Sequence, residues 1–195
     1  MIEDIKTKAL EEGVPIIKDE GLAFLLNFIR ENHPKNILEL GTAVGYSAMQ
    51  MASLDEEIHI DTIEKNEEMY LQAVENIANA HLEDQIHVFY MPIEEFATDK
   101  KYDLIFVDAA KAQYGKYTEM FLGNLAPEGF MIYDNMIFHG LVFRQEEIQS
   151  RSLRSLVRKI SNFREKVAND ERFDIMMKDN IGDGILILTR RKNAA

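Results

Sequence analysis

Short apolar runs recur along the chain, and several are followed by a segment with apolar residues at helical spacing. We predict seven strands from these runs: Asn36–Leu40, Ile58–Ile63, Ile86–Tyr90, Tyr102–Val107, Gly129–Tyr133, Phe173–Met177 and Ile185–Thr189. Strands that alternate with helices favour parallel pairing, with helices on both faces of the sheet. The last two strands follow each other without a helix, which predicts an antiparallel hairpin at one edge.

Four segments show helical spacing: Glu3–Glu12, Asp19–Glu31, Asn66–Ala80 and Glu147–Ala168. Asp19 has a side chain that is favoured at a helix N-cap, which predicts that it caps the second helix. The first two helices precede the first strand and form a helical extension over residues 1–34. The expected fold class is therefore α/β, a doubly wound, Rossmann-like sheet of seven mostly parallel strands with an antiparallel edge hairpin. No repeat or linker interrupts the 195 residues, which predicts a single domain over 1–195.

The composition narrows the classes of function. The chain has no cysteine, which excludes a disulfide scaffold, a thiolate zinc site, an iron–sulfur cluster and a cysteine nucleophile. The first residues are acidic and lack a long apolar run, so no signal peptide is expected, and no stretch approaches the ~20 apolar residues of a membrane span. We expect a cytoplasmic protein with no membrane partner.

A glycine-containing turn follows the first strand, in Glu39-Leu-Gly41-Thr42-Ala43-Val44-Gly45-Tyr46-Ser47. Ligands of such sheets bind beyond the carboxyl ends of the strands, and Gly41 and Gly45 let the backbone approach a ligand there. The spacing matches neither G-x-G-x-x-G nor a P-loop, which disfavours NAD and ATP. Glu64 ends the second strand, where a carboxylate can accept hydrogen bonds from both ribose hydroxyls and would repel a nearby phosphate. The pattern favours S-adenosylmethionine; alternatively, the glycines only permit packing and Glu64 is a solvated turn residue.

Carboxylates also end the fourth and fifth strands, in Val107-Asp108-Ala109-Ala110-Lys111 and Tyr133-Asp134-Asn135. Adjacent strand ends can bring Asp108, Asp134 and Asn135 together, and three oxygen ligands suit a hard cation, Mg²⁺ first. Lys111 lies one helical turn after Asp108 and could serve as a base near that metal. The alternative interpretation is that both aspartates are ordinary turn residues and Lys111 is a solvated lysine.

Five motifs together, ILELGTAVGYSA, TIEKN, DLIFVDAAKAQY, IYDN and NIGDGILI, resemble the cation-dependent, catechol-type O-methyltransferases of the S-adenosylmethionine class. The resemblance runs from about Val14 to Arg191, and DNMIFHGLV with the compact length is similar to small bacterial members that resemble tRNA 5-hydroxyuridine methyltransferase. It implies a class I methyltransferase fold and a homodimer that involves the N-terminal helices.

The resemblance also implies roles for particular residues. Cofactor contacts are implied at Val14, Glu39, Gly41, Thr42, Ser47, Glu64, Ile93 and Asp108, with Gly45 in the same turn. Metal ligation is implied for Asp108, Asp134 and Asn135, with Lys111 as the general base. The chain departs from the family at Met91-Pro92-Ile93, next to the implied contact at Ile93, and at His139, where related bacterial sequences often carry arginine.

The resemblance implies an enzyme with one of two classes of methyl acceptor. The alternative is a protein that binds a nucleoside without catalysis. The leading acceptor is the 5-hydroxyl of 5-hydroxyuridine in tRNA, whose enol oxygen beside a carbonyl presents an oxygen pair as a catechol does. The alternative acceptor is a small catechol-like or phenolic molecule. A non-catalytic nucleoside-binding module would not need Asp108, Lys111, Asp134 and Asn135 together.

The charge of the chain is unevenly distributed. The formal net charge is −12, and residues 1–98 carry 6 basic and 20 acidic side chains, whereas residues 99–195 carry 16 and 14. This acidity argues against indiscriminate binding of nucleic acid. Four basic residues fall opposite the apolar face of the last long helix: Arg151, Arg154, Arg158 and Lys166. They form either a solvated helix face or a surface that contacts RNA phosphates.

Overall fold

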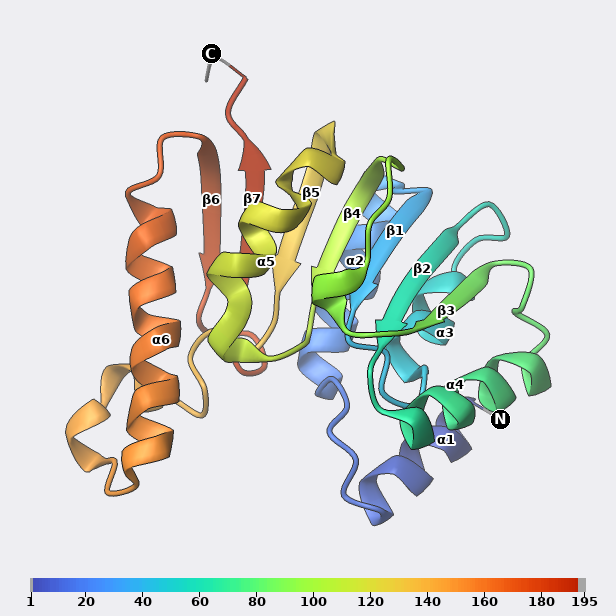
Figure 1. Ribbon diagram of the computed structural model, residues 1–195, viewed down its shortest axis with the longest axis horizontal. Helices are drawn as coiled ribbons and strands as arrows, with labels where there is room; N and C mark the ends of the chain where they lie inside the picture. Colours follow the sequence, from blue (N-terminus) through green and yellow to red (C-terminus); the bar gives the residue numbers. More distant parts are fainter. Residues whose placement is uncertain (1, 193–195) are drawn as a thin grey trace.

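The computed structural model describes residues 2–192 and contains one seven-stranded sheet (Figure 1). The strands are β1 (Asn36–Leu40), β2 (His59–Glu64), β3 (Ile86–Tyr90), β4 (Tyr102–Val107), β5 (Leu125–Tyr133), β6 (Phe173–Lys178) and β7 (Ile185–Arg190), in the order β3-β2-β1-β4-β5-β7-β6. The first five are parallel, and β7 pairs antiparallel with both β5 and β6. The predicted α/β fold class, with its antiparallel edge hairpin, is confirmed.

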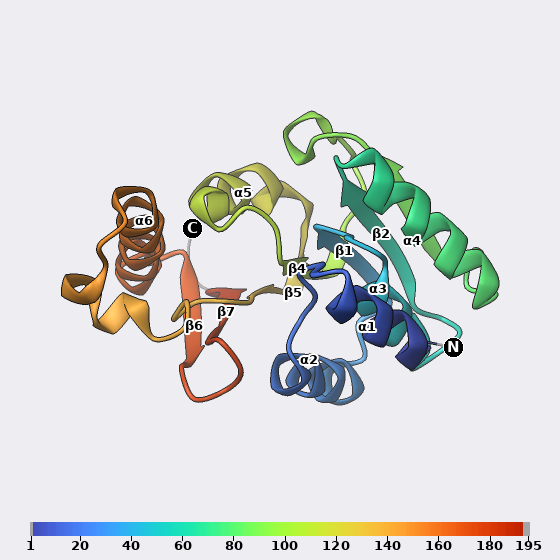
Figure 2. The same ribbon diagram turned by 90° about the horizontal axis from the view of Figure 1, so that it is seen from below.

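Helices cover both faces of the sheet. They are α1 (Ile2–Glu11), α2 (Asp19–Asn32), α3 (Tyr46–Ala52), α4 (Glu67–Asn79), α5 (Tyr114–Phe121) and α6 (Arg151–Ala168). One apolar core joins the sheet to residues of α1 to α4, and a second joins the opposite face to α5 and α6. Seen from below, α2 and α5 lie on opposite sides of the sheet (Figure 2). The N-terminal extension therefore packs as one of the covering layers.

The strand order reverses between β1 and β4, and the carboxyl ends of these two strands are in close contact there. The amide of Asp108 donates to the carbonyl of Leu40 at 3.1 Å. A Cβ on Gly41 would lie 2.6 Å from the carbonyl oxygen of Asp108, and the φ of Gly41 is +103°. No side chain other than hydrogen fits this junction, because backbone occupies the space that a Cβ needs. Gly41 thus holds the two predicted halves of the site together.

Several local predictions need correction. Asp19 is the first residue of α2, and the N-cap is Lys18, whose side chain makes no capping hydrogen bond. The Asp19 carboxylate pairs instead with Lys6 Nζ of α1 at 2.6 Å, so tertiary contact overrides the local capping preference. The last long helix begins at Arg151 rather than at Glu147, because the Ser150 side chain accepts from the amide of Leu153 and caps it. The short helices α3 and α5 were not predicted.

No helix in the described part of the chain has the length and apolarity needed to cross a membrane.

Candidate active site

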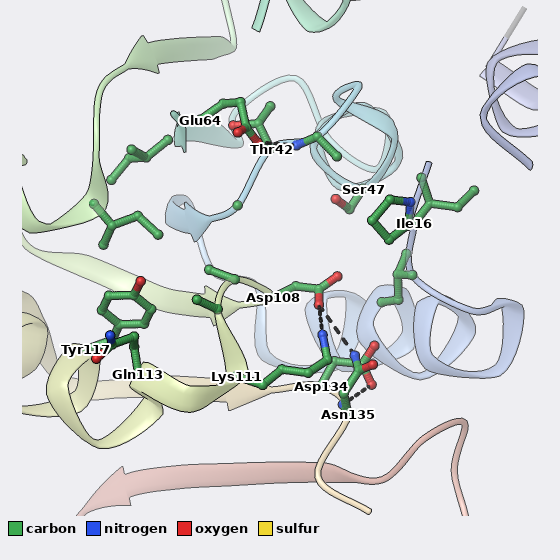
Figure 3. A pocket seen from close by; sticks show the side chains of 18 of the residues that line it. Ile16, Thr42, Ser47, Glu64, Asp108, Lys111, Gln113, Tyr117, Asp134 and Asn135 are labelled. Carbon is green, nitrogen blue, oxygen red and sulfur yellow. Dashed lines mark hydrogen bonds and ion pairs between the residues drawn. The ribbon is translucent and has the colours of Figure 1, made fainter. Parts of the chain in front are cut away.

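A cavity of about 620 Å³ opens at the carboxyl ends of the strands. Nine of the predicted residues line it: Gly41, Thr42, Ser47, Glu64, Ile93, Asp108, Lys111, Asp134 and Asn135. Figure 3 shows Glu64 and Thr42 at one end of the cavity and Lys111, Asp134 and Asn135 at the other, with Asp108 between them. The volume lies within the range of small-molecule and cofactor sites. Tertiary structure therefore gathers the two groups of residues that the sequence predicted separately.

Three predicted cofactor residues do not line this cavity. Glu39 is fully buried behind Ser47, and Gly45 is the N-cap of α3 with a φ of +83°. A Cβ on Gly45 would lie 3.4 Å from Cβ of Ala73 in α4, so this glycine allows both the turn and close helix packing. Val14 packs with its side chain half-buried against the core, and its amide donates to the carbonyl of Ala9.

The buried carboxylate of Glu39 organises the wall of the cavity from behind. Its two oxygens accept hydrogen bonds from the hydroxyls of Ser47 and Thr62, both at 2.5 Å. Thr62 also bonds to the hydroxyl of Thr42 at 2.7 Å. Burial raises the pKa of Glu39 to about 7, although the two hydroxyl donors oppose the shift. Glu39 therefore fixes Thr42 and Ser47, which face the cavity, and does not reach the cavity itself.

Glu64 lines the cavity and also holds the glycine turn. One carboxylate oxygen accepts from the amide of Ala43 at 2.9 Å, and the other accepts from the amide of Asn66 at 2.8 Å. Each oxygen keeps a second lone pair for a ligand hydroxyl. Ile93 lies beside Glu64 on the cavity wall and is 9% exposed, despite the unusual sequence around it.

The second end of the cavity concentrates the predicted metal ligands. The side-chain nitrogen Nδ2 of Asn135 lies 3.4 Å from Oδ1 of Asp108, and Lys111 Nζ lies 3.8 Å from the same oxygen. Asp134 is 3% exposed, and one of its oxygens accepts from the amide of Asn135 at 2.7 Å. The hydroxyl of Tyr114 donates to the Asp134 carbonyl and anchors this strand end.

The electrostatics of this end fit a bound cation. Burial, and then the nearby charge of Asp134, raise the pKa of Asp108 to about 7, and Lys111 opposes this shift. Burial also raises the pKa of Asp134, against the effects of the Asn135 amide and Lys111. Two carboxylates that disfavour each other's ionisation are stabilised when a divalent cation binds between them. Among the described residues, no three His, Cys, Asp or Glu side chains converge on a metal, so the fitting set is two carboxylates with one amide.

Several residues that line the cavity were not predicted from the sequence. The segment Pro15–Lys18, which precedes α2, forms one wall, and Phe138 forms another together with His139, the position at which the chain departs from its bacterial relatives. Tyr117 of α5 and Gln113 add a third, mixed polar and apolar surface. The family resemblance pointed to Val14 as a cofactor contact. Val14 itself does not line the cavity, but the residues that follow it, Pro15–Lys18, do.

The four basic residues of α6 differ in their contacts. Arg154 donates through Nε and Nη2 to the carbonyl of Ile148, and Lys166 pairs with Glu119 at 3.2 Å. Arg151 and Arg158 are exposed, and so is the adjacent Lys159. The structure thus assigns local contacts to two of the four and leaves the side chains of Arg151 and Arg158 on the surface.

The sequence model of the O-methyltransferase family matches residues 4–192. The chain belongs to this family. A caffeoyl-CoA O-methyltransferase from Populus kitakamiensis is 31% identical over 187 residues, which cover 91% of this chain and 79% of that protein. A flavonoid 3′,5′-methyltransferase from Vitis vinifera is 30% identical over 191 residues, which cover 91% of this chain and 78% of that protein. The chain is therefore an O-methyltransferase, and the resemblance seen in its motifs is confirmed at the level of the family.

Solved structures agree with this assignment. A Staphylococcus aureus protein that is provisionally assigned as a caffeoyl-CoA O-methyltransferase superposes with a TM-score of 0.93 at 38% identity, covering 97% of this chain and 92% of that one. An O-methyltransferase from Bacillus cereus, solved with S-adenosylhomocysteine, superposes with a TM-score of 0.80 at 24% identity and covers 97% of this chain and 90% of that one. The second likeness shows that the fold is shared.

Proposed function

We propose that this O-methyltransferase uses S-adenosylmethionine and Mg²⁺ to methylate the 5-hydroxyl of 5-hydroxyuridine in tRNA, which gives 5-methoxyuridine. One observation supports the chemistry: the cluster of Asp108, Asp134, Asn135 and Lys111 opens into the same cavity as Thr42, Ser47 and Glu64. The donor site and the acceptor site would thus share one cavity. Transfer of a methyl group requires this, because the two bound molecules must be in contact.

The end of the cavity near the glycine turn suits the nucleoside part of the donor. Glu64 offers lone pairs to ribose hydroxyls, and Ile93 supplies an apolar surface beside the adenine position. Thr42 and Ser47 present hydroxyls whose orientation is fixed by the buried Glu39. Asp108 stands between the two ends and would border the methionyl group.

The other end would hold the acceptor. Asp108, Asp134 and Asn135 are the residues that would hold Mg²⁺. When bound, S-adenosylmethionine supplies an electrophilic methyl group, and Mg²⁺ supplies the charge that lowers the pKa of the acceptor hydroxyl. Lys111 Nζ lies 3.8 Å from Asp108 and, as the neutral amine, would accept the proton of that hydroxyl. Phe138 and Tyr117 line the same chamber and would exclude water around the acceptor.

The tRNA acceptor is supported by the motif resemblance and by the exposed basic side chains of Arg151 and Arg158 on an otherwise acidic protein. These residues follow the loop that carries Phe138 and His139 along the chain. A tRNA whose phosphate backbone contacts α6 would meet these positive charges, which a small acceptor does not need.

A second acceptor class, a small catechol-like or phenolic molecule, is favoured by the relatives that are named for caffeoyl-CoA and flavonoid substrates. Both classes present the paired oxygens that a cation held by Asp108, Asp134 and Asn135 would engage. The two classes differ in their dependence on phosphate contacts.

Mass spectrometry of tRNA nucleosides from cells that lack this protein decides between the two acceptors. If tRNA is the acceptor, 5-methoxyuridine and its derivatives disappear and 5-hydroxyuridine accumulates, and purified protein with Mg²⁺ and S-adenosylmethionine restores the modification in vitro. An unchanged nucleoside profile together with methylation of a simple catechol would overturn the tRNA proposal and leave the chemistry intact.

A further inference from the structure

The buried carboxylate of Asp183 lies in the turn between β6 and β7, and the chemistry described above does not use it. Its side chain is 3% exposed. One oxygen, Oδ1, accepts from the backbone amide of His139 at 2.6 Å. The other oxygen, Oδ2, is buried and has no hydrogen-bond partner among the described residues. A buried carboxylate that is only partly satisfied costs free energy, so a compensating role is expected.

The segment that Asp183 holds has an unusual backbone. Asn135, Phe138 and His139 adopt φ values of +61°, +46° and +56°, and Gly140 follows at +76°. Residues with side chains rarely adopt this left-handed region, and they persist there only where surrounding structure enforces it. Residues 135–140 therefore form a loop whose conformation has to be imposed from outside.

The turn between β6 and β7 imposes that conformation through three hydrogen bonds. The amides of Met136 and Ile137 donate to the carbonyls of Gly184 and Asp183, both at 2.9 Å. Both acceptors are backbone carbonyls, so these two bonds do not require a particular side chain at position 183. The third bond, from the His139 amide, goes to the Asp183 side chain and exists only because position 183 carries a short acceptor.

The same carboxylate also lies close to a charged side chain from a second wall of the cavity. Lys18 Nζ, from the segment before α2, lies 3.9 Å from Oδ1 of Asp183, and Nδ1 of His139 lies 3.7 Å from Oδ2. Lys18 Nζ and His139 Nδ1 are 3.4 Å apart, and both residues line the cavity. The buried carboxylate of Asp183 thus lies close to both Lys18 and His139, which are 121 residues apart in the sequence.

We propose that Asp183 is a positioning residue for the acceptor end of the cavity. It fixes Phe138 and His139 on one wall, and its charge draws Lys18, from the segment before α2, toward His139. The acceptor then enters a preformed site, which lowers the entropy that binding costs. The donor end of the cavity, built on Glu64 and Ser47, does not touch this turn. The inference rests on the proposed function in placing the acceptor beside Asn135.

Asp183→Asn and Asp183→Ala test the proposal together. Asparagine keeps an oxygen for the His139 amide but removes the charge, whereas alanine removes both. Asp174→Asn is the matched control, because Asp174 is an exposed carboxylate in the same hairpin that pairs with Arg191. The measurements are hydrogen exchange of the 135–140 amides, calorimetry with S-adenosylhomocysteine, and kinetics with tRNA that carries 5-hydroxyuridine.

Asp183→Ala is expected to lose protection at the His139 amide, to raise KM for the tRNA at least about tenfold, and to change the affinity for S-adenosylhomocysteine less than twofold. Asp183→Asn is expected to keep the amide protection and to raise KM by a smaller factor, and Asp174→Asn to match the wild type. Unchanged amide protection in Asp183→Ala, or a loss of S-adenosylhomocysteine affinity as large as the rise in KM, would overturn the positioning role.

Two outcomes outside this pattern are also informative. If Asp183→Ala does not fold, Asp183→Asn alone decides, because a variant with wild-type KM would show that the charge has no effect on the acceptor. If the wild type methylates neither tRNA nor a catechol, the proposed function fails, whereas amide exchange and calorimetry still test how Asp183 holds the loop.

Discussion

At the scale of single residues, Glu39 couples stability to pH. Its carboxyl is fully buried, and burial raises its pKa from 4.5 to about 7. The folded state therefore keeps a proton on Glu39 between these values, so the contribution of Glu39 to stability falls as pH rises from about 4.5 to about 7 and is constant above. The change amounts to about 3 kcal/mol, because each pKa unit is worth ~1.4 kcal/mol.

Glu39→Gln mimics the protonated carboxyl at every pH and removes this dependence. In urea unfolding from pH 4.5 to 8, the free energy of unfolding of the variant is expected to rise relative to that of the wild type until about pH 7. Above pH 7 the difference is expected to stay constant. Glu31→Gln, a change at an exposed position of α2, serves as the control. A stability difference between Glu39→Gln and wild type that does not vary with pH would contradict the assignment.

Asp134 provides a second test at this scale. Asp134→Ala removes one of two charged ligands of the proposed cation and is expected to abolish methyl transfer while the circular dichroism spectrum stays native. Binding of S-adenosylhomocysteine, measured by calorimetry, is expected to persist, since the donor end is formed by other strand ends. Wild-type activity should be lost in EDTA and recovered with Mg²⁺; full activity in EDTA would refute the cation-dependent mechanism.

At the scale of elements, α6 separates the two acceptor classes. Arg151→Glu with Arg158→Glu places negative charge on the exposed helix face and leaves its buried side chains, such as Val157 and Ile160, unchanged. Stability is expected to change little, because both sites are exposed. If tRNA binds here, its KM rises at least about tenfold, and the salt dependence of binding becomes shallower as phosphate contacts are lost.

The matched control for α6 reverses the same number of charges elsewhere, as Lys8→Glu with Arg30→Glu on α1 and α2. This variant shares the change in net charge and should bind tRNA as the wild type does, apart from a general electrostatic effect. Methylation of a simple catechol should be equal in all three proteins. Equal loss of tRNA binding in both charge-reversal variants would mean that net charge, and not the α6 face, governs binding.

At the scale of the whole molecule, the exposed surface of α1 provides a test of the expected homodimer. Leu10 on α1 is a large apolar side chain that is 60% exposed. The family resemblance implies a homodimer that involves the N-terminal helices, and an exposed leucine suits such an interface. Leu10→Glu is expected to convert a dimer into a monomer in light scattering, whereas Leu71→Glu, at a 58% exposed site on α4, should not. A monomeric wild type would overturn the dimer.

The strands and the long helices were predictable because burial leaves a local signature. A buried strand such as Tyr102–Val107 is a short run of mostly apolar residues, and the predicted bounds of this run agree with those of β4. The short helices α3 and α5 escaped prediction because seven or eight residues hold too few turns to display a helical period. The start of α6 was misplaced because the Ser150 cap decides it, and Asp19 was wrongly given the cap of α2 because its carboxylate pairs with Lys6 instead.

The sequence by itself determined the fold class, the family and the identity of the strand-end residues, because apolar periodicity and motif spacing are local properties of the chain. Only the tertiary structure decided which of these residues face a common cavity. It places Glu39 behind the wall rather than on it, and it brings Lys18 to His139 over the buried Asp183. Contacts between segments 121 residues apart depend on how the whole sheet and its covering helices pack, and no local pattern encodes them.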